Sequence, residues 1–111
     1  MQVKLKKAGS TLIVQMVGEL DHHAVDAMRK KIDLKLNHED FRNILFDFYG
    51  VNFMDSSGLG MILGRYKIVS EKGGKVSACS LNSRVMRVFE MAGLQTKIPV
   101  YSSEQDALTG A

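Results

Sequence analysis

The sequence contains little that could form a covalent crosslink or hold a metal ion. It has one cysteine, Cys79, no tryptophan and one proline in 111 residues. A single cysteine excludes an internal disulfide and cannot build a metal site alone. One proline and no long polar tract argue against a disordered linker. Because no run of eighteen uninterrupted apolar residues occurs, the sequence predicts no transmembrane helix and no membrane partner.

Signals for export and for nucleic-acid binding are also weak. The first ten residues, MQVKLKKAGS, are basic but lack the apolar core of a signal peptide, so we expect a cytoplasmic protein. The net charge is +3. Its densest basic run, residues 29–31, has no interleaved aromatic residues and is typical of a solvated helix face. We therefore predict no nucleic-acid partner.

The composition is that of one ordinary globular domain. Apolar residues make up 45% and charged residues 24% of the chain. A chain of 111 residues is long enough for one hydrophobic core and not for two. We find no internal repeat, and we expect a monomer that forms a single domain over residues 1–111.

Hydrophobic patterning predicts the element order ββαβαβαβα. The predicted strands are residues 2–6, 11–18, 43–50, 75–80 and 96–101, and the predicted helices lie within 18–37, 56–74, 82–93 and 102–111. The first two strands, joined by a turn at 8–10, read as an antiparallel hairpin. Each later strand is followed by a helix, which favours parallel neighbours. The fold class is therefore α/β, with a mixed, mostly parallel sheet, an N-terminal hairpin and about four helices.

The segment FMDSSGLGMILGRYK, residues 53–67, is the main candidate site. It lies at a strand-to-helix turn, where function concentrates in open α/β sheets. Ser56 is placed to cap the following helix. Gly58 and Gly60 weaken that helix in its first turn. The glycines are explained equally well by close packing and by access for a partner.

Several chemistries can be compared at this turn. A serine hydrolase elbow needs glycines two residues before and after the nucleophile, but Met54 and Asp55 occupy the preceding positions for Ser56 and Ser57. No histidine follows the serines, and no phosphate-binding loop with Lys-Ser or Lys-Thr is present. His22 and His23 are adjacent, so they do not share a helix face and predict no metal site. A structural cap explains only one of the two serines.

A phosphorylation site accounts for every residue of the turn. The glycines would give a kinase access to Ser56. The phosphate would lie at a helix N-terminus, where the dipole and free N–H groups tolerate negative charge. Phosphorylation would therefore leave the fold intact and place charge beside Asp55, blocking a partner.

Four segments in matching order resemble one family across nearly the whole chain. They are GELDHH at 18–23, FMDSSGLGMILGRYK at 53–67, SRVMRVFEMAGL at 83–94 and EQDAL at 104–108. Together they are similar to the anti-sigma factor antagonists of the STAS domain family, most closely to the sporulation type. The basic net charge is not explained by this resemblance.

The resemblance implies a regulatory protein that is not an enzyme and has no cofactor of its own. Such antagonists bind an anti-sigma factor that is a serine kinase carrying ATP or ADP, and binding releases the sigma factor. The kinase phosphorylates the first serine of DSSG, here Ser56, and a serine phosphatase restores the active form. We accordingly expect the partner-binding surface to contain Asp21, Asp55, Ser56, Ser57, Gly58 and Gly60.

Helix periodicity suggests one further contact. Leu59, Ile62, Leu63, Tyr66 and Val69 form the expected buried stripe of the helix after Ser56. Met61 and Ile68 would then share an exposed face with Arg65. Met61 is expected either to form an adaptable apolar contact with the partner or to pack under a neighbouring element.

Two alternatives remain open at this point. One is a receiver-like module with Asp47 or Asp55 as the phosphoacceptor, although such modules lack the N-terminal hairpin predicted here. The other is a STAS antagonist of a general stress pathway, which would use the same mechanism with a different sigma factor.

Overall fold

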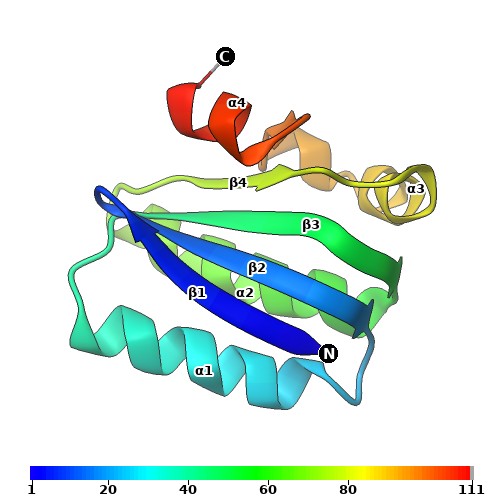
Figure 1. The fold of residues 1–111 in the computed structure, drawn as a ribbon, viewed down its shortest axis with the longest axis horizontal. Coiled ribbons are helices and arrows are strands. Elements are labelled where there is room, and N and C mark those ends of the chain that lie inside the picture. The colour runs from blue at the N-terminus through cyan, green and yellow to red at the C-terminus, as the bar shows by residue number, and fades with distance from the viewer. Residues whose placement is uncertain (111) are drawn as a thin grey trace.

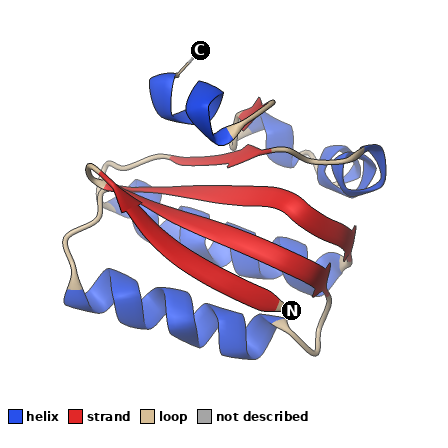
Figure 2. Ribbon diagram, viewed as in Figure 1, coloured by secondary structure: helices blue, strands red, loops and turns tan. Residues whose placement is uncertain are grey.

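The five apolar runs form one sheet, and the computed structural model describes it over residues 1–110 (Figures 1 and 2). The strands are β1 (Gln2–Ala8), β2 (Thr11–Leu20), β3 (Asn43–Met54), β4 (Val76–Cys79) and β5 (Val100–Tyr101). The helices are α1 (Val25–His38), α2 (Ser56–Glu71), α3 (Ser83–Met91) and α4 (Glu104–Thr109), with a 3-10 turn at Leu94–Thr96. The predicted element order is confirmed.

The strands follow one another across the sheet in chain order. β1 and β2 pair antiparallel, and Ala8 faces Thr11 where the hairpin closes. The pairs β2–β3, β3–β4 and β4–β5 are parallel. The mixed, mostly parallel sheet is thus confirmed, with β3 at its centre. β5 has only two residues and lies at the edge after Pro99, whose nitrogen cannot donate a hydrogen bond to a neighbouring strand.

Helices α1 and α2 cover one face of the sheet (Figure 1). α1 packs Met28, Ile32 and Leu36 inward, as its periodicity predicts. The same core continues beneath α3, where Phe48 of β3 and Phe89 meet edge to face with ring centroids 6.3 Å apart. The opposite face carries the short helix α4 near β4 and β5 and a small apolar cluster. Within residues 1–110, no helix has the length and hydropathy needed to span a bilayer.

The predicted orientation of α2 is correct for Ile62 and Val69, which are buried, and wrong for Met61 and Arg65. Met61 is 5% exposed and belongs to the core. Arg65, which was expected on an exposed face with Met61, is also buried. Tyr66, assigned to the buried stripe, is only half-buried. Apolar residues surround this helix on several sides, so periodicity could not select the packed face. An exposed apolar contact by Met61 is therefore excluded.

The outer edge of the sheet is partly covered by a lysine. Lys31 of α1 donates a hydrogen bond from Nζ to the backbone oxygen of Val3 in β1, at 2.9 Å. Residue Val3 therefore turns its carbonyl away from β2 and toward α1. Alternate residues of β1 present their backbone groups to the same edge.

Candidate functional site

Two predicted site segments meet at the carboxyl edge of the sheet. Leu20 and Met54 are paired at the ends of the parallel strands β2 and β3. Asp21 and Asp55 follow these two residues directly. The backbone N–H of Asp55 donates to the carbonyl oxygen of Leu20 at 3.3 Å. GELDHH and DSSG, far apart in the sequence, therefore lie side by side.

Asp55 caps α2, so the assignment of this role to Ser56 is wrong. Asp55 Oδ1 accepts hydrogen bonds from the backbone N–H groups of Ser57 at 2.9 Å and Gly58 at 3.3 Å. The backbone of Asp55 is extended, as an N-cap residue requires, whereas Ser56 is already helical. A carboxylate at this position also faces the positive end of the helix dipole favourably.

Ser56 does not cap the helix. It is the first residue of α2 and is exposed. Ser57 is half-buried and lines a pocket between α1 and α2. The two adjacent serines therefore differ in access. Ser56 is the more accessible of the two.

Gly58 and Gly60 have different surroundings, so their lack of a side chain has a different consequence at each position. A Cβ on Gly58 would lie 2.8 Å from the backbone oxygen of Leu20 and 2.9 Å from the Met54 side chain, so Gly58 permits close packing of α2 on the strand ends. It is buried, and its predicted role in partner access is wrong. A Cβ on Gly60 would meet nothing within 4 Å. Gly60 is exposed and remains part of the accessible surface.

Asp21 organises the turn before α1. Its Oδ1 accepts from the backbone N–H groups of His23 at 3.0 Å and Ala24 at 3.1 Å. The helix then begins at Val25. Asp21 is half-buried, with its carboxylate held at the same edge of the sheet as the Ser56 turn.

The sequence patterns did not single out two residues at this edge of the sheet, Asn82 and Phe53. Asn82 caps α3 by accepting from Val85 N at 2.8 Å, and it donates from Nδ2 to the carbonyl oxygen of Val51 in β3 at 3.1 Å. The sequence signal was an asparagine directly before an apolar helical pattern. Phe53, two residues before Asp55, is 40% exposed. It is a large apolar side chain exposed beside the turn, the position for which Met61 was predicted.

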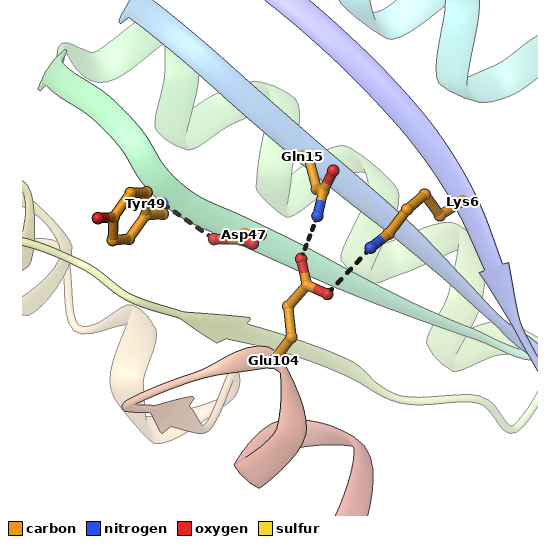
Figure 3. Close-up of polar contacts among 5 residues, drawn as sticks. All are labelled: Lys6, Gln15, Asp47, Tyr49 and Glu104. Carbon is orange, nitrogen blue, oxygen red and sulfur yellow. Dashed lines mark hydrogen bonds and ion pairs between the residues drawn. The ribbon is translucent and has the colours of Figure 1, made fainter.

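A second polar cluster lies on the opposite face of the sheet (Figure 3). Glu104 of α4 accepts from Gln15 Nε2 at 2.5 Å and pairs with Lys6 Nζ at 3.4 Å. The adjacent Asp47 accepts from the backbone N–H of Tyr49 at 2.9 Å. Burial, and after it the neighbouring Glu104 carboxyl, raise the pKa of Asp47 to about 6. The neighbouring Asp47 carboxyl is the main factor that lowers the pKa of Glu104.

These positions disfavour the receiver-like alternative. Asp47 is 9% exposed in the middle of β3, and Asp55 is engaged as a helix cap.

Cys79 pairs with Asp47 across the parallel strands and is buried, which raises the pKa of its thiol to about 12. At that value the thiol is not a nucleophile near neutral pH. Among residues 1–110, no three histidine, cysteine, aspartate or glutamate side chains cluster as a metal site would need.

Comparison with known proteins matches the whole domain. The sequence model of the STAS domain matches residues 2–107. The anti-sigma F factor antagonist of Paenibacillus polymyxa is 40% identical over 109 residues, which cover 98% of this chain and 93% of the relative. The anti-sigma-B factor antagonist of Bacillus subtilis strain 168 is 31% identical, with 93% of each chain covered.

Solved structures show the same fold. The anti-sigma factor antagonist SpoIIAA in its unphosphorylated form superposes with a TM-score of 0.85 at 30% identity, covering 99% of this chain and 98% of that one. The phosphorylated form of the Bacillus cell fate determinant SpoIIAA gives a TM-score of 0.77 at 29% identity, with 97% of each chain covered.

Proposed function

The chain belongs to the STAS domain family, and we propose that it is an anti-sigma factor antagonist switched off by phosphorylation of Ser56. The unphosphorylated protein binds an anti-sigma factor that is a serine kinase, and binding releases the sigma factor. A serine phosphatase reverses the modification. Similarity to two named antagonists supports the general function. That SpoIIAA is known in a phosphorylated form supports the switch.

The observation that carries the switch is the exposure of Ser56 at the first position of α2. The γ-phosphoryl group of the kinase's ATP is transferred to Ser56 Oγ, the hydroxyl proton is lost, and ADP is the leaving product. All catalytic groups belong to the kinase. The phosphate is tolerated at the helix N-terminus because the helix dipole stabilises negative charge there.

The same phosphate disturbs the surface around it. Asp55 and Asp21 already place two carboxylates at this edge, so a dianion adds like charge where a partner must fit. We assign Asp21, Asp55, Ser56, Ser57 and Gly60 to the surface that the partner covers. Phe53 supplies the exposed apolar contact there.

The acceptor assignment is tested by incubating the protein with an anti-sigma factor kinase and ATP, followed by phosphopeptide mapping. We expect phosphate on Ser56 in the wild type and no incorporation in Ser56→Ala. The matched control Ser57→Ala should retain phosphorylation. Phosphate on Ser57 in the wild-type protein would contradict the assignment.

One observation supports the general stress pathway as a second candidate: the chain is 31% identical to an anti-sigma-B factor antagonist. The sporulation pathway has the stronger support, because the anti-sigma F relative is 40% identical. Binding measured side by side to the anti-sigma F and anti-sigma-B factors decides between them. Tighter binding to the anti-sigma-B factor would overturn the sporulation assignment.

A further inference from the structure

The structure contains a pocket between α1 and α2 that adjoins the proposed phosphorylation turn. Its volume is about 250 Å³. Its walls come from both helices, and the lining residues are Val25, Asp26, Arg29, Ser57, Gly60, Met61 and Arg65. Gly60 leaves the wall open, because no side chain projects from it and a Cβ there would meet nothing within 4 Å.

Arg65 at this pocket is a buried cation without full compensation. The residue is 7% exposed. Its Nε lies 3.1 Å from Asp33 Oδ1, yet neither atom has a hydrogen-bond partner of acceptable geometry, and Arg65 Nη1 also has none among the described residues. The interaction with Asp33 is therefore an ion pair without a hydrogen bond. A buried guanidinium in this state lacks acceptors that it would have in water.

A second arginine faces the same pocket. Burial lowers the pKa of Arg65, Asp33 opposes this, and the positive charge of Arg29 lowers it further. Arg29 is itself held by Asp26 at 2.7 Å. Two guanidinium groups that repel each other across a pocket are stabilised when an anion lies between them.

The local charge count limits which anion fits. Of the charged residues that line the pocket, Arg29 and Arg65 are positive and Asp26 is negative. The sum is +1. One singly charged anion neutralises the cluster, whereas a doubly charged phosphate would leave an excess of negative charge beside Asp26.

We propose that this pocket is an oxyanion-binding site that takes one carboxylate side chain of the protein docking on the Ser56 turn. The carboxylate lies between Arg29 and Arg65 and supplies the acceptors that Asp33 does not. The identity of the carrier rests on the proposed function, but the anion preference of the pocket does not. The site would give the partner a fixed second contact beside the switchable one at Ser56.

The pocket is tested first without any partner. Sodium acetate and inorganic phosphate are titrated into the protein at constant ionic strength, with sodium chloride as reference, while the arginine Nε–H and Gly60 N–H signals are followed by NMR. We expect saturable shifts of Arg29, Arg65 and Gly60 with acetate. Shifts equal to those caused by chloride would overturn the site. Tighter binding of phosphate than of acetate would overturn the carboxylate assignment.

A matched pair of variants locates the effect. Arg29→Gln should weaken acetate binding roughly tenfold, because it removes one charge-assisted contact. Lys30→Gln is the control, since Lys30 also pairs with Asp26 but does not line the pocket. Equal weakening by both variants would show a general charge effect and overturn the site. Arg65 is left unchanged, because replacing a buried residue could unfold the protein.

The same variants are then compared for binding to the anti-sigma factor. Arg29→Gln should lose affinity and Lys30→Gln should retain it. Retained affinity in Arg29→Gln would contradict docking through this pocket. If the wild-type protein binds no anti-sigma factor, the proposed function fails, while the acetate titration still decides whether the pocket binds carboxylates.

Discussion

The two faces of the sheet differ in what covers them. The face beneath α1 and α2 is apolar and closed, with Leu12, Val14 and Phe46 fully buried. The opposite face has a small apolar cluster under α4, the polar cluster around Glu104, and an open end where Tyr49 is 87% exposed. Stability should therefore depend on packing at the first face and on protonation at the second. The candidate site lies at the strand ends, where the packed face holds it in place.

The largest effect is expected from Met61→Lys on the packed face. Met61 is 5% exposed, so the variant removes a buried side chain and places a charge in the core. We expect a loss of about 3 kcal/mol or more in the free energy of unfolding. Chemical denaturation measures it. Met91→Lys is the control, because Met91 on α3 is 82% exposed. Similar stability of the two variants would show that the packed face tolerates charge.

Gly58→Ala tests the contact between α2 and the strand ends. The added Cβ would lie 2.8 Å from the backbone oxygen of Leu20, which cannot move aside easily. We expect a loss of about 1–3 kcal/mol. Gly60→Ala, two residues later and in open space, should instead be stabilising by up to about 1 kcal/mol. If both variants are stabilising, α2 does not pack closely at Gly58.

Asp47→Asn tests the open face through its pH dependence. The pKa of Asp47 is raised from 3.8 to about 6, so the folded protein binds this proton more tightly than the unfolded chain does. The stability that protonated Asp47 contributes is fully present below pH 3.8 and is lost as the pH rises through about 6. The lowered pKa of Glu104 acts oppositely, and its contribution is lost as the pH falls.

The variant should therefore remove the decline in stability between about pH 4 and pH 6 and raise stability at pH 7 by about 1–2 kcal/mol. Urea unfolding across this range measures both effects. Asp40→Asn, at an exposed aspartate, is the control and should keep the decline. An unchanged pH profile in Asp47→Asn would mean that Asp47 does not cause the decline.

The smallest effect on stability is expected from Ser56→Asp at the boundary between the faces. A negative charge at the start of α2 should change the free energy of unfolding by less than about 1 kcal/mol. Binding to the anti-sigma factor should weaken by roughly 1–3 kcal/mol, because the charge lies in the interface. Thermal denaturation and calorimetry measure the two quantities. Undiminished affinity would refute an electrostatic block.

A second aspartate variant on the same helix separates local charge from helix position. Ser70 lies near the end of α2, and its hydroxyl donates to the carbonyl oxygen of Tyr66 at 2.7 Å. Ser70→Asp should be destabilising, because it places negative charge at the negative end of the helix dipole. Its affinity for the anti-sigma factor should be unchanged. Weakened binding in this variant would show that the effect of Ser56→Asp is not local.

The sequence predicted the strands and helices well because their patterns were local. Alternation identified the hairpin, and the spacing of Met28, Ile32 and Leu36 gave the correct face of α1. On α2 the apolar residues are too numerous to define one face, so burial of Met61 depends on the shape of the sheet beneath it. Burial of Arg65 has no periodic signal, since it depends on Asp33 from another helix.

Three predictions for the candidate site are wrong: the capping role of Ser56, the accessibility of Gly58 and the exposure of Met61. Asp55 and Ser56 are both good capping residues in adjacent positions, and only the backbone conformation selects Asp55. Gly58 and Gly60 are indistinguishable by composition, and the carbonyl oxygen of Leu20 separates their roles. The side-by-side placement of Asp21 and the Ser56 turn depends on the parallel pairing of β2 with β3.

The contact between Lys31 and the carbonyl oxygen of Val3 bears on self-assembly. An exposed edge strand such as β1 is a template on which another chain can add a strand. At Val3 the acceptor that such a strand would need is already occupied by the Lys31 ammonium group. An incoming strand must displace this charge or bury it, and both cost free energy. The Lys31 contact thus disfavours the addition of another strand to β1 at Val3.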